Sequence, residues 1–156
     1  MSLVCQVKQK ICDECLDTKC SKEGCILTLA NVPRPFILID MDHEKAPIDK
    51  QDQNRCDYIF VSDDGAWTAP LELTRGKLEA SKVVPQLKAG AKVAEQIVPP
   101  RARVRFRAIA IYGGEFRRAE RDKLNQKTNH IPFRGEMYPI KARRCGSPLV
   151  SVLGKA

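Results

Sequence analysis

The sequence has 156 residues, enough for one domain with a hydrophobic core and too few for two domains of ordinary size. It is 43% hydrophobic and 29% charged, which is ordinary for a globular chain and argues against a disordered or fibrous protein. The formal net charge is +8, and this charge is unevenly distributed.

The basic residues gather in the last third of the chain. Residues 99–156 carry 14 Lys and Arg against 4 Asp and Glu, whereas residues 1–98 carry 13 against 15. Such a field attracts polyanions, so it favours a nucleic-acid partner over a surface that serves only solubility. No apolar run has the length of a membrane helix, and residues 1–11 lack the core of a signal peptide. We therefore expect a soluble, cytoplasmic protein without membrane contact.

Residues 1–35 form a cysteine-rich opening, in which residues 24–29 are expected to be helical or irregular. An odd total of 7 cysteines argues against a disulfide framework. Zinc prefers tetrahedral sulfur ligation, and a gap of two residues lets one turn present two ligands. The alternatives are therefore a zinc site and reduced cysteines packed as small apolar groups. The candidate ligands are Cys12, Cys15, Cys20 and Cys25.

Three apolar runs follow, and each predicts a β-strand because prolines, charges or turn residues bound it. They cover residues 36–41, 56–62 and 67–74. Asp63-Asp-Gly-Ala66 supplies a hairpin turn between the second run and the third, since Asp-Gly readily adopts positive φ. The polar residues 43–55 are expected to form a loop.

Residues 78–98 predict a helix, because their apolar residues are spaced for one buried face. Pro85 fits this helix if the helix begins near Ser81, or if it kinks at the proline. Pro99-Pro100 ends it.

The basic part of the chain begins with a strand predicted over residues 101–112. Four arginines alternate with smaller residues at its start, and guanidiniums in register suit the repeating phosphates of nucleic acid. A charged helix over residues 115–127 extends this surface. The alternative is an edge strand protected by its own charge. The candidate nucleic-acid contacts are Arg101, Arg103, Arg105, Arg107, Arg117 and Arg118.

A final hairpin is predicted over residues 131–145 with its turn at Gly135, and the tail after Gly146 is expected to be loosely held. The order of the elements predicts an α/β fold with a mixed central sheet and helices packed on it. We expect a single domain over residues 1–156, with a basic extension over residues 113–156.

Two carboxylates meet on the predicted hairpin of the second and third strands. Asp57 opens one strand and Glu72 lies near the end of its partner, so the turn places them nearly opposite each other. Carboxylates held together in apolar surroundings repel each other unless a cation separates them, and Mg²⁺ prefers oxygen ligands of this kind. The alternative is a pair of solvated strand-end carboxylates. Asp40 and Asp42 end the first strand nearby and are secondary candidates.

Asp57 on one strand, Glu72-Leu-Thr74 on the next and Gln86 on the following helix resemble the PD-(D/E)XK nuclease superfamily. The resemblance covers residues 36–112 and implies a restriction-endonuclease-like αβββαβ core. It implies that Asp57 and Glu72 bind Mg²⁺ or Mn²⁺, which would activate water for phosphodiester hydrolysis. It also implies that Gln86 is a polar residue of the active site.

The sequence departs from this family at Thr74, where the family has a lysine that orients water and stabilises the developing anion. Lys77 and Lys82 are candidates for a relocated lysine. Without such a lysine, the chain would be a catalytically degenerate nuclease-fold protein that binds nucleic acid or a protein partner.

The resemblance carries further expectations for cofactors and partners. Some members of the superfamily hold an iron–sulfur cluster with cysteines from both chain ends, so Cys145 is a candidate for the distant ligand. Many members act as homodimers. DNA is the expected nucleic acid, bound through its backbone, since an aromatic content of 6% offers few stacking platforms.

Overall fold

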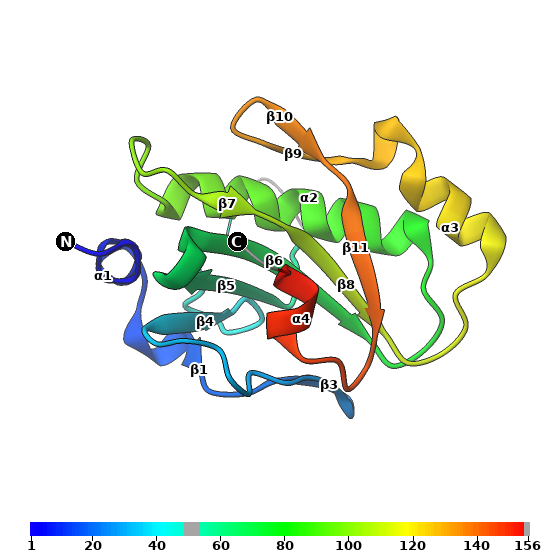
Figure 1. Ribbon diagram of the computed structural model, residues 1–156, viewed down its shortest axis with the longest axis horizontal. Helices are drawn as coiled ribbons and strands as arrows, with labels where there is room; N and C mark the ends of the chain where they lie inside the picture. Colours follow the sequence, from blue (N-terminus) through cyan, green and yellow to red (C-terminus); the bar gives the residue numbers. More distant parts are fainter. Residues whose placement is uncertain (49–53, 155–156) are drawn as a thin grey trace.

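The structure is a computed structural model that describes residues 1–48 and 54–154. Its centre is a seven-stranded mixed sheet (Figure 1). Residues 49–53, part of the loop expected over residues 43–55, lie outside the described residues. In spatial order, the sheet contains β1 (Leu16–Asp17), β4 (Phe36–Asp40), β5 (Tyr58–Ser62), β6 (Trp67–Thr74), β8 (Ala108–Tyr112) and β11 (Ile140–Arg144), while β7 (Arg105–Phe106) also pairs with β6.

The strand directions follow from the connections between the strands. β4, β5 and β6 form an antiparallel meander, in which residues 41–57 connect β4 to β5 and a short turn over residues 63–66 connects β5 to β6. α2 (Ala80–Ile97) then crosses the sheet, so β8 pairs in parallel with β6. The strands predicted over residues 36–41, 56–62 and 67–74 and the helix predicted over residues 78–98 are confirmed.

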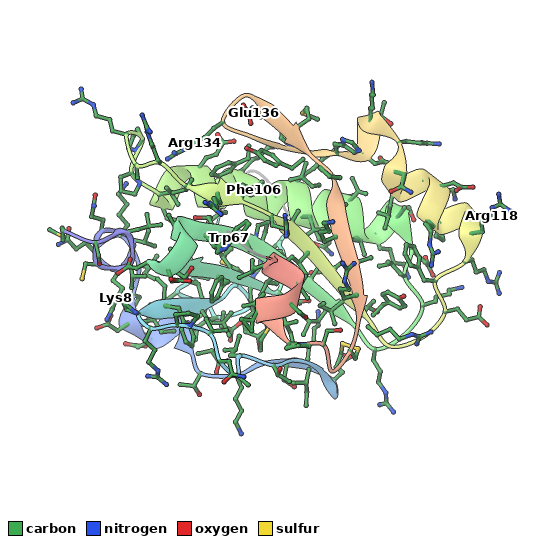
Figure 2. The ribbon with its side chains drawn as sticks, viewed as in Figure 1. Lys8, Trp67, Phe106, Arg118, Arg134 and Glu136 are labelled. Atoms are coloured by element: carbon green, nitrogen blue, oxygen red, sulfur yellow. A yellow bond between two sulfur atoms is a disulfide. The ribbon has the colours of Figure 1, made fainter. Side chains whose placement is uncertain are left out.

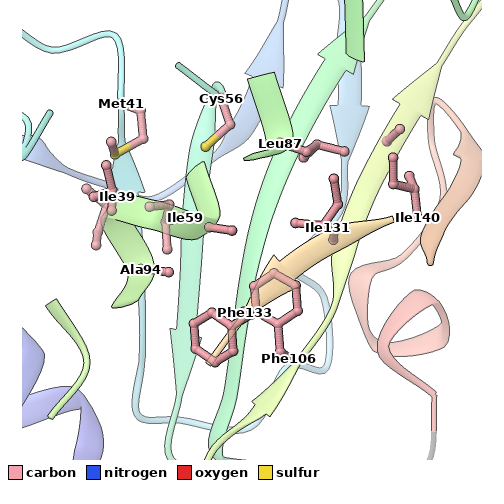
Figure 3. Close-up of a cluster of buried hydrophobic side chains, with 14 of the residues drawn as sticks. Ile39, Met41, Cys56, Ile59, Leu87, Ala94, Phe106, Ile131, Phe133 and Ile140 are labelled. Carbon is pink, nitrogen blue, oxygen red and sulfur yellow. The ribbon is translucent and has the colours of Figure 1, made fainter. Parts of the chain in front are cut away.

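α2 covers one face of the sheet (Figure 1). Leu87 and Ala94 of this helix belong to the same buried cluster as Ile59 of β5 (Figure 3). The helix begins at Ala80, and Pro85 lies inside it. Its approach to the sheet requires glycine at position 90, where an added Cβ would lie 2.5 Å from the Sγ of Cys56.

The opposite face of the sheet is covered by a hairpin of β2 (Cys20–Lys22) and β3 (Cys25–Leu27) and by α4 (Leu149–Leu153). Two predictions were wrong here. Residues 24–29 contain a strand, because Gly24 at φ 86° closes a tight turn that lets Cys25 pair back with Lys22. The tail after Gly146 is held, because Leu149, Val152 and Leu153 are buried against the sheet.

The basic strand is shorter than predicted. Arg101 lies in a turn and Arg103 outside any strand, and only β7 and β8 pair within the expected range 101–112. The start of the segment turns instead, because the backbone N–H of Ala102 donates to the Pro99 carbonyl at 3.0 Å and the Arg134 guanidinium donates to the carbonyls of Pro99 and Ala102.

The last predicted hairpin divides into two parts. β9 (Ile131–Phe133) and β10 (Glu136–Tyr138) form it around Gly135, but β11 leaves it and joins the central sheet in parallel with β8. β9 packs against α2, and the ring of its Phe133 stacks on Phe106 of β7 at 4.3 Å between centroids. α1 (Leu3–Lys8) and α3 (Arg118–Asn125) lie at opposite ends of the molecule in Figure 1. Among the described residues, no helix is long and apolar enough to cross a membrane.

Candidate active site

Asp57 and Glu72 lie opposite each other at one end of the β5–β6 pair. Tyr58 is registered with Leu71, so the preceding Asp57 faces Glu72 one step beyond the ladder. The backbone N–H of Asp57 donates to the Leu71 carbonyl at 3.0 Å and fixes this arrangement. Alternation along the strands directs both carboxylates to the sheet face that α2 covers.

The Asp57 carboxylate is buried, with 3% of the residue exposed, and both of its oxygens accept hydrogen bonds. Oδ2 accepts from the backbone N–H of Leu73 at 2.7 Å. Oδ1 accepts from the Nζ of Lys22 at 2.6 Å, so these groups form a charge-assisted ion pair. Asp57 is therefore held in a single orientation from two sides.

Glu72 is not satisfied in the same way. Its Oε1 is buried and has no hydrogen-bond partner among the described residues. Burial, followed by the charge of Asp57 and a hydrogen bond to it, raises the pKa of Glu72 to about 9, although Lys22 opposes this rise. Glu72 is thus protonated at neutral pH unless a cation binds beside it. An orphaned carboxylate oxygen next to a fixed carboxylate is a suitable place for a divalent ion.

A pocket of about 440 Å³ opens beside this pair. Glu72 contributes to its wall from β6, and residues at the start of α2 form the opposite wall. Three residues proposed from the sequence and the unexpected Lys22 also line it. These are Lys22, Lys77, Lys82 and Gln86.

Lys77 and Lys82, the two candidates for a relocated lysine, line the pocket, and both form ion pairs with Glu79. The Nζ of Lys77 is 3.4 Å from Oε1 of Glu79, and the Nζ of Lys82 is 3.6 Å from Oε2 of Glu79. Both lysine side chains are mostly exposed, so these ion pairs are weak and leave the ammonium groups free to move. Gln86 accepts the backbone N–H of Arg55 at 2.9 Å and so anchors the segment that leads to Asp57. Thr74 lines the same pocket.

Lys22 is the residue that sequence reasoning missed. It lies on the β2–β3 hairpin, which packs on the opposite face of the sheet, and its side chain reaches the start of β5. Burial alone would lower the pKa of Lys22, but the hydrogen bond and charge of Asp57 outweigh this effect and raise it. No spacing in the sequence relates Lys22 to Asp57, because tertiary packing of the hairpin brings them together.

The secondary acidic candidates lie beside this site. Asp42 follows β4, and its backbone N–H donates to Oδ1 of Asp40 at 2.9 Å. Burial, followed by the charge of Asp57, raises the pKa of Asp42. Asp42 therefore adds negative potential to the edge of the site.

The structure separates the four cysteines that were proposed as metal ligands. Cys15 is buried in the cluster beneath α2, and its Sγ lies 3.7 Å from Nδ1 of His43, with Cys12 packed against the same cluster. Cys20 and Cys25 belong to the cluster on the opposite face. Cys25 forms a disulfide with Cys145, contrary to the expectation of reduced thiols. Within residues 1–48 and 54–154, no group of three or more Cys, His, Asp or Glu side chains is arranged to hold a metal.

Arg117 and Arg118 lie at the start of α3. Arg117 lines a second pocket of about 240 Å³ that shares Lys77 and Glu79 with the first pocket. Arg118 projects from the end of the molecule opposite to Lys8 (Figure 2). These arginines are exposed, and Arg117 forms an ion pair with Glu115 at 3.0 Å.

The arginines of residues 101–107 lie at the other end of β6. Arg105 is registered with Trp67, five residues before Glu72, which is about 17 Å along a strand. Arg101, Arg103 and Arg105 are exposed. Arg107 lies on the same side as Arg105, since both guanidiniums lie over the Trp67 ring. Arg107 is partly buried and donates to the carbonyls of Val152 and Leu153, so it caps the last turn of α4 and is less exposed than the other three arginines.

Comparisons with known proteins found no relative of this chain. No protein-family model, no curated protein and no solved structure matches the chain.

Proposed function

We propose that this chain is a metal-dependent, nuclease-like hydrolase that acts on nucleic-acid phosphodiesters at Asp57 and Glu72. The observation that carries the proposal is the pairing of the buried Asp57 with the half-buried Glu72 at the wall of a polar pocket, with the buried Oε1 of Glu72 left without a partner among the described residues. Buried polar atoms are rarely left unpaired, so an orphaned carboxylate oxygen indicates a ligand.

The order of the elements supports a PD-(D/E)XK-like core. An antiparallel meander of β4, β5 and β6, followed by α2 and then by β8 in parallel with β6, agrees with a βββαβ arrangement. Asp57 precedes the second of these strands and Glu72 lies on the third. This is the placement that the resemblance implies for its metal ligands.

The donor set fits Mg²⁺ or Mn²⁺ better than a soft metal. Asp57 and Glu72 offer carboxylate oxygens, and a divalent ion bound there would activate water and neutralise phosphodiester charge. Leu73 holds Asp57 in place through its backbone N–H. Gln86 fixes the segment before Asp57, while Lys77 and Lys82 supply mobile positive charge at the opposite wall.

The basic residues around α3 support nucleic acid, and DNA in particular, as the substrate. Arg117 and Lys123 line the pocket that adjoins the acidic site, where they pair with Glu115 and Glu120, and a phosphate group entering from this side would compete with these glutamates for the two cations. Arg101, Arg103 and Arg105 offer a second contact about 17 Å along β6 from Glu72, within reach of one duplex.

Plasmid nicking tests the proposal. We expect the wild-type protein to nick supercoiled DNA in Mg²⁺ or Mn²⁺, and Asp57→Asn and Glu72→Gln to lower the rate by about a hundredfold or more. Asp64→Asn is the matched control, because Asp64 is an exposed carboxylate at the other end of the same β5–β6 hairpin.

Two outcomes would count against this assignment. Nicking that persists in both active-site variants would place the activity elsewhere. A wild-type protein that binds DNA without cutting it would instead support the catalytically degenerate protein, for which Thr74 in the pocket is the specific observation.

A further inference from the structure

Lys22 occupies an unusual position for a surface lysine. Its ammonium lies 2.6 Å from Oδ1 of Asp57, yet 40% of its side chain is exposed, whereas only 4% of the Asp57 side chain is. The same lysine lines the 440 Å³ pocket together with Glu72. One side of the ammonium therefore contacts the buried acid, and the other side faces the space that a substrate would enter.

The hairpin that carries Lys22 is fixed to the rest of the fold. Lys22 is registered with Cys25, and the disulfide from Cys25 to Cys145 joins the hairpin to the end of β11. The hydroxyl of Tyr58 donates to the Ser21 carbonyl at 2.9 Å, on the residue before Lys22. These restraints act on both sides of the lysine, so its position is built into the fold.

The charges of the site indicate what Lys22 is for. Two ionised carboxylates and one divalent ion cancel, so Asp57 and Glu72 with their metal would be neutral. The Lys22 ammonium adds one positive charge, which matches the single negative charge of a phosphodiester. Without Lys22, the positive charges left at the pocket belong to Lys77 and Lys82, which already pair with Glu79. An ammonium that is held in place stabilises a bound anion more than a mobile one, because no reorganisation is needed when the anion binds.

We propose that Lys22 is the residue that binds the phosphodiester group at this site, which makes the β2–β3 hairpin part of the active site. The inference rests on the proposed function. It assigns to Lys22 a contact with a non-bridging phosphate oxygen, made from the exposed side of an ammonium that Asp57 holds in place. Lys77 and Lys82, which pair with Glu79, act at the entrance of the pocket.

The test uses Lys22→Met, Lys22→Arg and, as the matched control, Lys19→Met, since Lys19 is an exposed lysine at the start of the same hairpin. The small diester bis(4-nitrophenyl) phosphate is the substrate, because it is too small to reach the distant arginines. Mn²⁺ binding is measured separately by electron paramagnetic resonance, with no diester present.

We expect Lys22→Met to bind Mn²⁺ at least as tightly as wild type, since a neighbouring positive charge is removed. Its kcat/KM for the diester should fall by about tenfold or more. Lys22→Arg should recover part of this loss, and Lys19→Met should match wild type. If the ion pair of Lys22 with Asp57 were only structural, Lys22→Met would instead lower the Mn²⁺ affinity and kcat/KM together.

The failures are distinguishable. If Lys22→Met keeps the wild-type kcat/KM, the role of Lys22 is overturned. The same holds if Lys22→Met loses both kcat/KM and Mn²⁺ binding. In both cases the proposed function still stands. A wild-type protein that neither binds Mn²⁺ nor hydrolyses the diester overturns the proposed function, and the inference falls with it.

Discussion

Glu72 is half-buried beside Asp57, and this placement makes the stability of the fold depend on pH. The ordinary pKa of 4.5 applies in the unfolded chain, whereas burial and Asp57 raise the pKa in the folded protein to about 9. Between these values, the folded state keeps a proton that the unfolded state has released. The contribution of Glu72 to stability is therefore complete below the unfolded pKa and is lost as pH rises through the folded pKa, by at most about 1.4 kcal/mol per pH unit.

Glu72→Gln removes this titration and retains the shape of the side chain. We expect the metal-free variant to be more stable than wild type above about pH 5, with a difference that widens up to about pH 9. Urea unfolding at several pH values measures it. Glu44→Gln is the control, since Glu44 is exposed. A difference that stays constant with pH would contradict the burial of Glu72.

Substitutions at Thr74 test whether a positive charge on this wall of the pocket supports the activity of the site. Thr74→Lys places an ammonium on the same wall of the pocket as Glu72. In a Lys22→Met background, we expect this change to restore plasmid nicking by about tenfold, because it returns the missing positive charge. Thr74→Met, which has a similar length without the charge, should restore nothing. Equal rates in both double variants would show that charge at this wall is irrelevant.

At the scale of the element, the central strands and α2 could be predicted, because apolar runs, an Asp-Gly turn and a helical repeat each specify them locally. The pairing of Asp57 with Glu72 followed from that turn alone. Lys22 could not be predicted, since β2 and β3 have three residues each and no strong alternation. The partial burial of Arg107 could not be predicted for a related reason: its partners are the carbonyls of Val152 and Leu153, which lie 45 and 46 residues further along the chain.

The Cys25–Cys145 disulfide links residues that are 120 positions apart, so it restricts the unfolded chain strongly. We expect the Cys25→Ser, Cys145→Ser double variant to lose about 2–5 kcal/mol of unfolding free energy, measured by urea unfolding. Backbone hydrogen bonds between residues 26–28 and 146–149 remain, so the hairpin should stay folded. Cys5→Ser is the control, because Cys5 is a free, exposed cysteine. An equal loss in the control would indicate that the disulfide contributes nothing.

At the scale of the whole molecule, positive charge lies at two separate ends of the sheet. Arg117 lines the pocket that adjoins the acidic one, and Arg105 of the exposed arginines at 101, 103 and 105 pairs at the start of β6. The composition predicted a basic surface, but its division into two parts depends on where α3 and β7 pack. The sequence alone could therefore not predict that the arginines form two separate groups.

Salt dependence measures the contribution of the second surface. Replacing Arg101, Arg103 and Arg105 with alanine should weaken duplex DNA binding and reduce the slope of log affinity against log salt by about 2–3. Fluorescence anisotropy with a short labelled duplex provides the data. The control replaces three basic residues of the near-neutral part, Lys19, Arg34 and Lys45, and should change the slope less. An unchanged slope in the arginine variant would exclude phosphate contacts at this end.

The central claim is that Asp57 and Glu72 together bind a divalent cation, and a Mn²⁺ titration followed by electron paramagnetic resonance tests it most directly. We predict one bound ion per chain in the wild type, with affinity lowered about tenfold or more in Asp57→Asn and in Glu72→Gln. Asp64→Asn should bind as the wild type does. Equal Mn²⁺ affinity in all four proteins, or no bound Mn²⁺ in the wild type, would contradict the account.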